Sequence, residues 1–173
     1  MSKNNISNYI EKYSIFYLSK YSVTKQKFAN VLQKKILKDF LHKKLTKNER
    51  DEALRKVDFF VSKYSDIRLI NEEIIIKNRI SNLMRKGSSV KKIFLTLKSD
   101  KFNDNLINAE IEQIRKEENI EYKLIDVFSR KKKLARYDIN WDQTNRKIYI
   151  KTLNKLLSNG FNINTCTNFL KSI

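Results

Sequence analysis

The sequence has no proline, two glycines, one cysteine and one histidine among its 173 residues. A single cysteine excludes a disulfide within the chain, and one histidine with one cysteine cannot make a zinc site. Sandwiches, barrels and glycine-rich phosphate loops need many turn residues, so this composition disfavours them. No stretch approaches about 18 consecutive apolar residues, and we therefore expect no membrane span. The class that remains is a helical protein.

Acidic side chains are scarce, because 37 Lys and Arg residues stand against 19 Asp and Glu residues and give a net charge of +18. AT-rich codon usage accounts for lysine in place of arginine, but it does not account for the excess of lysine over glutamate. Such a charge opposes compaction and favours a polyanionic partner such as nucleic acid or an acidic protein groove. The alternative is that the excess of lysine arose by drift on a solvent-exposed surface and reflects no partner. Residues 1–5 contain no apolar signal segment, and we expect a cytoplasmic protein.

Helix starts are marked by capping residues rather than by proline. Thr46 and Glu49 have the spacing of a capping box. Asn71 and Asn103 are further predicted caps, and either Asp142 or Thr144 is expected to cap a later helix. Apolar residues recur every three or four positions between these caps. The pattern predicts helices over residues 6–20, 24–42, 46–64, 71–86, 89–99, 103–117, 120–136, 144–158 and 162–171.

One pattern recurs three times along the chain. Residues 18–24 align with residues 83–89 and with residues 156–162. In each copy a leucine ends one apolar stripe, and a short connection leads into a second helix whose apolar residues face back onto the first. These later apolar positions stay in register, with Phe28 matching Ile93 and Cys166, and Leu32 matching Leu97 and Leu170.

Both glycines of the protein, Gly87 and Gly160, occupy the same position in this pattern. That position follows a helix end, where a left-handed backbone conformation favours glycine. Ser22 stands there in the first copy. Two residues later each copy has a predicted helix N-cap, namely Thr24, Ser89 and Asn162.

The pattern resembles the bacterial RecX regulators of RecA. Residues 17–24, followed by Phe28, Leu32 and Lys35, are similar to the first repeat of that family. Residues 69–73 are similar to its second repeat, with Arg79, the Lys86–Gly87 turn, Ile93 and Leu97 following them. Residues 156–161 are similar to its closing leucine-rich turn.

The resemblance implies an all-α fold, an elongated and curved solenoid-like array of tandem three-helix repeats. Three copies are expected, the last of them truncated. We assign residues 1–66 to repeat 1, residues 67–118 to repeat 2, and residues 119–173 to a linking helix and repeat 3. Ser22 in place of glycine, and Glu72 or Glu73 where the family usually has aspartate, depart from the family pattern.

The function implied by the resemblance is non-enzymatic regulation of the RecA recombinase. Such a protein docks along the RecA–DNA filament and inhibits or modulates recombination, DNA repair and the SOS response. The implied partners are the RecA filament and single- or double-stranded DNA within it. We expect a monomer with no cofactor and no membrane association.

No group of residues has a catalytic pattern. His42 has no second histidine and no adjacent nucleophile motif, so we interpret it as a surface residue. Cys166 aligns with buried positions and is predicted to be a small core residue. Glu110 and Glu112 are two residues apart on a helix and face different ways. The sequence therefore predicts no catalytic residue and no metal site.

Basic residues gather in three groups along the chain. They precede and line the helix after residue 24, flank the Gly87 turn, and fill the helix after residue 120. If the repeats form a solenoid, these groups recur as a discontinuous stripe. Taken singly, each lysine is better explained by exposure to solvent, and the recurrence of the groups is the observation that favours a binding surface. The residues predicted to face the filament or DNA are Lys20, Lys25, Lys27, Lys34, Lys35, Arg79, Arg85, Lys86, Lys91, Lys92, Arg130, Lys131, Lys132, Lys133 and Arg136.

Tyr9, Tyr13, Tyr17 and Tyr21 form a ladder at intervals of four residues on the first helix. Such a ladder can stack on exposed bases, or it can pack half-buried against a neighbouring helix. We favour packing, with the two outer tyrosines, Tyr9 and Tyr21, the more exposed members.

Two other functions remain open at this point. Residues 83–97 have a short connection that is compatible with a helix-turn-helix, which would make the protein a stand-alone DNA binder. A helical scaffold for an acidic protein partner is the other alternative.

Overall fold

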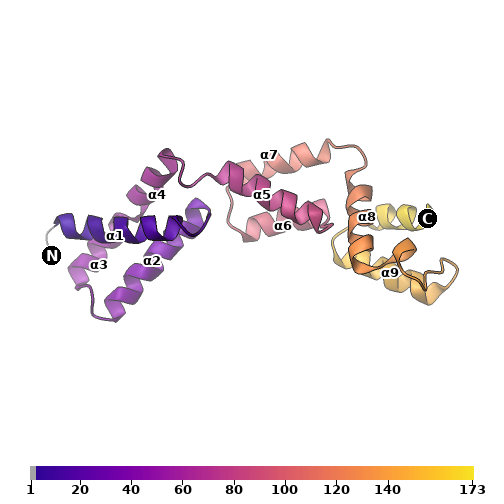
Figure 1. The fold of residues 1–173 in the computed structure, drawn as a ribbon, viewed down its shortest axis with the longest axis horizontal. Coiled ribbons are helices and arrows are strands. Elements are labelled where there is room, and N and C mark those ends of the chain that lie inside the picture. Colours follow the sequence, from indigo (N-terminus) through magenta and orange to yellow (C-terminus); the bar gives the residue numbers. More distant parts are fainter. Residues whose placement is uncertain (1–2) are drawn as a thin grey trace. The chain divides into compact units, whose positions relative to one another are not determined.

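The computed structural model describes the backbone of residues 3–173 and the side chains from residue 6 onward (Figure 1). The described residues form helices and no strand, which confirms the all-α prediction. None of these helices is long and apolar enough to cross a membrane. The helices are α1 (Lys3–Leu18), α2 (Lys25–Leu41), α3 (Lys47–Arg55), α4 (Val57–Asp66), α5 (Glu72–Arg85), α6 (Val90–Ser99), α7 (Asp104–Arg115), α8 (Ile120–Lys132), the 3₁₀ turn η1 (Ala135–Tyr137), α9 (Arg146–Ser158) and α10 (Ile163–Lys171).

The chain divides into two compact units, residues 1–75 and residues 76–173, which we call unit 1 and unit 2. The division into three repeats with boundaries after residues 66 and 118 stays a prediction. In unit 1, α2 packs against α3 and α4, and α1 packs against the same two helices. Their shared core consists of Ile6, Ile10, Phe28, Leu32, Ile36, Leu45, Ala53, Val57, Phe60, Tyr64 and Ile70.

Unit 2 begins within α5 and contains α6 to α10. Helix α6 packs against α7, and α10 packs against both α8 and α9. The apolar residues recur with helical spacing, so each helix turns one stripe inward. Among the residues buried in this unit are Ile76, Leu83, Ile93, Leu97, Ile107, Ile125, Leu156, Cys166 and Leu170.

The apolar positions that the sequence pattern places in register are buried. Phe28, Ile93 and Cys166 are each 0% exposed. The next set lies one helical turn further along and is equally enclosed, comprising Leu32, Leu97 and Leu170. The predicted core register of the second helix in each copy is therefore confirmed.

The predicted helix over residues 46–64 is wrong, because two helices, α3 and α4, occupy this segment. They meet at Lys56, whose backbone N–H donates to the carbonyls of Ala53 and Leu54 and tightens the chain for one turn. The change of direction buries Ala53 in α3 as well as Val57 in α4. The break falls at Lys56, where the sequence has neither proline nor glycine, so no local sequence signal predicts it.

The predicted helix over residues 120–136 is too long. Helix α8 ends at Lys132, because Lys133 adopts a left-handed conformation with φ of 50°. The backbone N–H of Leu134 then donates to the carbonyl of Ser129 at 2.9 Å. This stop turns Leu134 and Ala135 into the core, where they are 2% and 0% exposed. The burial of Leu134 and Ala135 therefore accounts for the end of α8, where the sequence has no proline or glycine to break the helix.

Most of the predicted caps are confirmed. Thr46 and Glu49 form the capping box, in which each residue's side chain accepts a hydrogen bond from the other's backbone N–H. Asn71 accepts from the backbone of Ile74, and Asn103 caps α7. The predicted cap at Asp142 or Thr144 is wrong by a few residues. Asn145 caps α9, while Asp142 accepts from the Thr144 backbone in the preceding turn.

Candidate nucleic-acid interface

The two glycine turns of unit 2 have the backbone predicted for them. Gly87 has φ of 72° and Gly160 has φ of 91°. After Gly87 the chain closes α5 with a hydrogen bond from Ser88 N–H to the Leu83 carbonyl at 3.1 Å. A matching bond after Gly160 links Phe161 N–H to the Leu156 carbonyl at 3.4 Å. Both turns are therefore helix ends of the Schellman type.

These two turns also lie against each other. The Asn159 side-chain amide donates to the Gly87 carbonyl at 2.8 Å, and Ser89 Oγ donates to the Asn159 carbonyl at 2.8 Å. A Cβ atom on Gly160 would lie 2.7 Å from Ser89 Oγ, and one on Gly87 would lie 2.6 Å from Phe128 Cα. Glycine is thus required at both turns by close packing as well as by backbone conformation.

The first copy differs at the corresponding position. Ser22 is exposed, it lies in the connection between α1 and α2, and its φ is not positive. The predicted N-caps that follow are confirmed in all three copies. Thr24 accepts from Lys27 N–H, Ser89 from Lys92 N–H, and Asn162 from Asn164 N–H. The missing glycine in the first copy thus coincides with a different turn and leaves the next helix start unchanged.

The first group of predicted basic residues lies in unit 1. Lys20, Lys25 and Lys34 are exposed, and the Lys20 ammonium lies 4.1 Å from the centre of the Phe16 ring. Lys27 is half-buried at the start of α2. Lys35 forms an ion pair with Asp39 at 2.7 Å. The exposed members of this group are the ones whose charge is directed to solvent.

The second group flanks the Gly87 turn in unit 2. Arg79 forms an ion pair with Asp100 at 2.7 Å, which offsets its charge. Lys92 Nζ donates to the Asn159 side-chain oxygen at 2.7 Å. The remaining members, Arg85, Lys86 and Lys91, are exposed.

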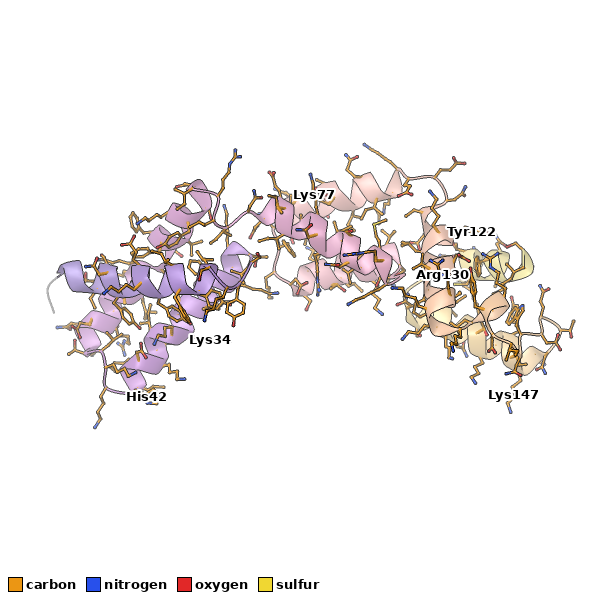
Figure 2. All side chains as sticks on the ribbon, in the orientation of Figure 1. Lys34, His42, Lys77, Tyr122, Arg130 and Lys147 are labelled. Carbon is orange, nitrogen blue, oxygen red and sulfur yellow. The ribbon has the colours of Figure 1, made fainter. Side chains whose placement is uncertain are left out.

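The third group lies at the end of α8 and just beyond it. Arg130, Lys131, Lys132 and Lys133 are all exposed, and Arg130 is labelled in Figure 2. The Gly87 turn packs on the α8 backbone at Phe128, two residues before Arg130.

Arg136 follows this group but has a different role. It forms an ion pair with Asp126, and its guanidinium lies 5.2 Å from the centre of the Tyr137 ring. The hydrogen bonds from Arg136 to Tyr137 and Asp126 raise the pKa of Arg136. Its positive charge is therefore balanced locally.

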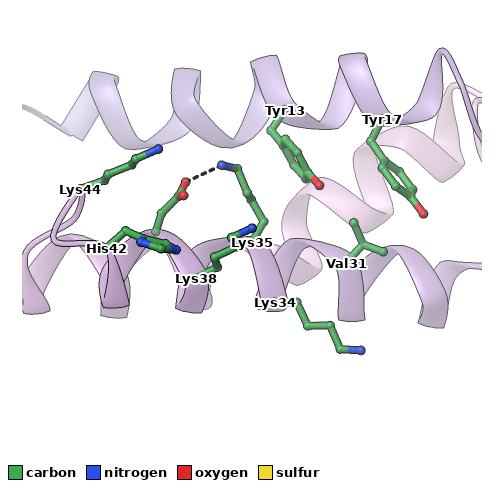
Figure 3. A pocket seen from close by; sticks show the side chains of 9 residues that line it. Tyr13, Tyr17, Val31, Lys34, Lys35, Lys38, His42 and Lys44 are labelled. Atoms are coloured by element: carbon green, nitrogen blue, oxygen red, sulfur yellow. Dashed lines mark ion pairs between the residues drawn. The ribbon is translucent and has the colours of Figure 1, made fainter.

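A groove of about 620 Å³ runs between α1 and α2 in unit 1 (Figure 3). We call it the α1–α2 groove. Tyr13 and Tyr17 line it from α1, and the other lining residues come from α2 and the turn after it. These are Val31, Lys34, Lys35, Lys38, Asp39, His42 and Lys44. Four lysines against one aspartate make the groove strongly basic.

The single acidic residue of the groove is held by several partners. Asp39 accepts a hydrogen bond from the Tyr9 hydroxyl at 2.6 Å and pairs with Lys35 at 2.7 Å. Burial by itself raises the pKa of Asp39, but the hydrogen bonds from Lys35 and Tyr9 and the charge of Lys44 together lower it. Asp39 therefore stays ionised and neutralises part of the lysine charge around it.

The tyrosine ladder packs as predicted, with one correction. Tyr13 and Tyr17 are half-buried with ring centres 6.2 Å apart, and Tyr17 also stacks on the core residue Phe28. Tyr21 is 55% exposed, as predicted. Tyr9 is half-buried rather than exposed, because its hydroxyl reaches Asp39 on α2. Burial and that hydrogen bond raise the pKa of Tyr9.

A second hollow, of about 710 Å³, lies in unit 2 beside the Gly160 turn. Glu121 lines it and accepts a hydrogen bond from Val90 N–H at 3.3 Å, at the start of α6. Burial raises the pKa of Glu121. Arg115 and Lys91 also line this hollow, so it is of mixed charge, in contrast to the α1–α2 groove.

Cys166 and His42 do not have the surroundings of reactive residues. Cys166 is fully buried, and this burial, together with the charge of Glu121, raises the pKa of its thiol to about 11. A thiol in this state is a poor nucleophile. His42 is exposed at the end of α2, as predicted, and it lines the basic groove.

Two buried polar residues, one in each unit, are absent from the predicted set. Asp39 is the one acidic residue in α2, and this is visible in the sequence. Its role as a partner of Tyr9 becomes clear only when α1 is seen to lie beside α2. Asn159 joins the two glycine turns across 72 residues of sequence, and no local pattern announces such a contact.

No protein-family model and no curated protein matches this sequence. Among solved structures, the crystal structure of RecX from Lactobacillus salivarius matches with a TM-score of 0.62 and 20% sequence identity. The match covers 99% of this chain and 100% of that chain. The chain has the fold of RecX. The resemblance to RecX in the repeated turns is thus confirmed at the level of the structure, and the RecX-like fold spans both unit 1 and unit 2.

Proposed function

We propose that this protein regulates a RecA-type recombinase by binding the RecA–DNA filament, without catalysing a reaction itself. The observation that carries the proposal is the full-length match to the RecX fold. The net charge of +18 supports it, because the filament contains a polyanion. The exposed basic groups of both units supply contacts for DNA phosphates or for acidic filament surfaces.

Regulation of this kind needs a long contact surface rather than a pocket with reactive groups. Bound across neighbouring RecA subunits, the protein would wedge between them or displace them. Filament growth and ATP turnover would then fall together, and recombination, DNA repair and the SOS response would be inhibited or modulated. A monomer suffices for this action.

The proposal is tested with RecA filaments on single-stranded DNA. We expect near-stoichiometric protein to lower ATP turnover and shorten the filaments, measured by coupled ATPase assay and electron microscopy. A protein without effect on either quantity would contradict the proposal. Lys131→Glu with Lys132→Glu should weaken the effect, since both residues are exposed at the end of α8.

The stand-alone helix-turn-helix is less well supported by the geometry. In such a motif the start of the second helix reads base edges in the major groove. Here the connection before α6 is buried, with Gly87, Ser88 and Ser89 enclosed by neighbouring segments. Binding to naked DNA that persists at high salt and depends on sequence would favour that alternative, because phosphate contacts alone weaken steeply with salt. Strong binding to an acidic protein without DNA would favour the scaffold alternative.

A further inference from the structure

We propose that the α1–α2 groove is a binding site for a single strand of nucleic acid, with phosphates along α2 and a base against the Tyr13 ring. The proposal rests on the proposed function for its biological role, since it locates one DNA contact of the regulator. The site itself lies wholly within unit 1 and is testable without RecA.

Exposed basic side chains follow one face of α2 and its C-terminal end. Lys34 and Lys38 are four residues apart on α2, His42 follows four residues later at the C-cap, and all three are exposed. Residues with this spacing share one face of a helix and are separated by a rise of about 6 Å per step. Lys44 adds a further ammonium group at the end of the groove (Figure 3). A chain of phosphates can therefore meet the ammonium groups of Lys34, Lys38 and Lys44 in turn.

Repulsion from within the groove is small. Asp39 is its only acidic lining residue, and it is already paired with Lys35 and hydrogen-bonded to Tyr9. Its side chain is 5% exposed, which keeps the carboxylate away from an incoming phosphate. An ion-paired and buried acid thus fixes Lys35 in place and leaves the outer lysines to the ligand.

The opposite wall supplies aromatic rings. Tyr13 and Tyr17 point from α1 into the groove (Figure 3). The Lys35 ammonium lies 5.4 Å from the centre of the Tyr13 ring and holds this ring beside the cations. Bases stack on such rings without regard to sequence, while phosphates bind the adjacent lysines. Tyr17 stacks on both Tyr13 and the core residue Phe28, so we assign the base to the Tyr13 ring.

This combination favours a single strand over other polyanions. A double helix encloses its base faces, so it offers phosphates to the lysines but nothing to Tyr13. An acidic protein offers carboxylates without flat base faces. The ligand that uses both walls of the groove is an unpaired nucleic-acid strand.

The first test measures the binding of a fluorescent single-stranded oligonucleotide to the full chain by anisotropy over a series of salt concentrations. We expect Lys34→Glu with Lys38→Glu to weaken binding by about tenfold or more at low salt. The slope of log affinity against log salt should become shallower by about 1 to 2, since each lost phosphate contact removes about 0.7.

The matched control is Lys47→Glu with Arg55→Glu. Both residues are exposed on α3, which contributes no residue to the groove, and the same charge is lost. The control should change affinity by less than about threefold. Equal losses for the two double variants would overturn the proposal, because they would show a response to net charge alone. No loss from the groove variant would overturn it as well.

The second test isolates the ring. Tyr13→Leu should weaken single-strand binding by about five- to tenfold, whereas Tyr13→Phe should retain it, since stacking needs the ring and not the hydroxyl. Circular dichroism melts show whether either variant alters the fold. Unchanged binding by a folded Tyr13→Leu variant would remove the base-stacking half of the proposal. Polyglutamate that displaces the oligonucleotide at equal charge would instead identify an acidic protein as the occupant.

The two proposals fail in distinguishable ways. If wild-type protein binds the oligonucleotide through the groove but leaves RecA unaffected, the site is upheld and the proposed function is wrong. If RecA is inhibited equally by the wild type and by the Lys34→Glu, Lys38→Glu variant, while neither shows groove-dependent binding, the site is wrong and the proposed function is upheld.

Discussion

Asp39 is the one acidic residue of α2, and it lies almost wholly inside unit 1. Its carboxylate joins two helices, because it accepts from Tyr9 on α1 and pairs with Lys35 on α2. A buried charge is costly unless it is paired and hydrogen-bonded, and here both conditions are met. Removing the Asp39 charge therefore leaves the Lys35 ammonium and the Tyr9 hydroxyl with a weaker partner.

We expect Asp39→Asn to lower the free energy of unfolding by about 1–2 kcal/mol at pH 7, measured by urea denaturation. The lowered pKa of Asp39 means that its stabilisation is present above the pKa of the unfolded state, about 3.9, and is lost as the pH falls through the folded value. The difference between the two proteins should therefore shrink as the pH falls below about 5. Asp66→Asn, at an exposed site, should show no such dependence. A constant difference at all pH values would contradict the assigned role.

At the scale of secondary-structure elements, the backbone conformation at helix ends sets where the chain turns. Left-handed residues follow several helices, and at most of these ends the residue is not glycine. Lys101 is an example, with φ of 65° after α6. Such a conformation costs an L-residue about 1–2 kcal/mol, so the protein tolerates this strain at several of its helix ends.

The glycine turns behave differently, and substitutions should rank accordingly. Gly87→Ala should lower the free energy of unfolding by about 3 kcal/mol, because the new Cβ meets the α8 backbone at Phe128. Gly160→Ala should cost less, since its Cβ meets one side-chain atom, the Ser89 hydroxyl oxygen, rather than backbone atoms. Lys101→Gly, the matched control, should raise stability by about 0.5–1 kcal/mol. Thermal and urea unfolding of the three variants measure this order, and a Gly87→Ala protein as stable as the wild type would refute it.

Local residue chemistry predicts most elements of this chain, and tertiary burial decides the rest. The capping box at Thr46, the caps at Ser89 and Asn162, and the glycine turns follow from side-chain and backbone preferences. The break at Lys56 does not, because it is set by what the two flanking helices bury.

The same division holds for the candidate site. The sequence places lysines along α2 and tyrosines along α1, and their helical spacing is enough to predict a shared face for each set. It does not reveal that Tyr9 turns inward to Asp39, because this contact spans 30 residues and needs the two helices side by side. The basic groove is thus predictable in composition, but its walls are defined only by packing.

At the scale of the whole molecule, the net charge of +18 acts on both stability and binding. Exposed like charges repel one another in the folded protein, and salt screens this repulsion. The ion pairs that are present, such as Arg79 with Asp100, offset only part of it.

We therefore expect the melting temperature to rise as sodium chloride is raised from about 0.02 to 0.2 M, the range in which the Debye length falls to roughly 10 Å or below. The Lys47→Glu, Arg55→Glu variant carries less positive charge and should show a flatter dependence. Differential scanning calorimetry measures both. A melting temperature that falls with salt in the wild type would mean that attractive pairs outweigh the repulsion.

The contact between the two glycine turns has a consequence for synthesis on the ribosome. The core of unit 1 draws on residues 6–70, so it can form while the rest of the chain is still being made. The contacts of the Gly87 turn cannot form this early, because the Gly87 carbonyl accepts a hydrogen bond from Asn159, which lies 72 residues later in the sequence. Contacts so distant in sequence slow folding, and the Gly87 turn before α6 lacks this contact until Asn159 has been synthesised. The nascent chain therefore acquires one folded, basic half well before the other.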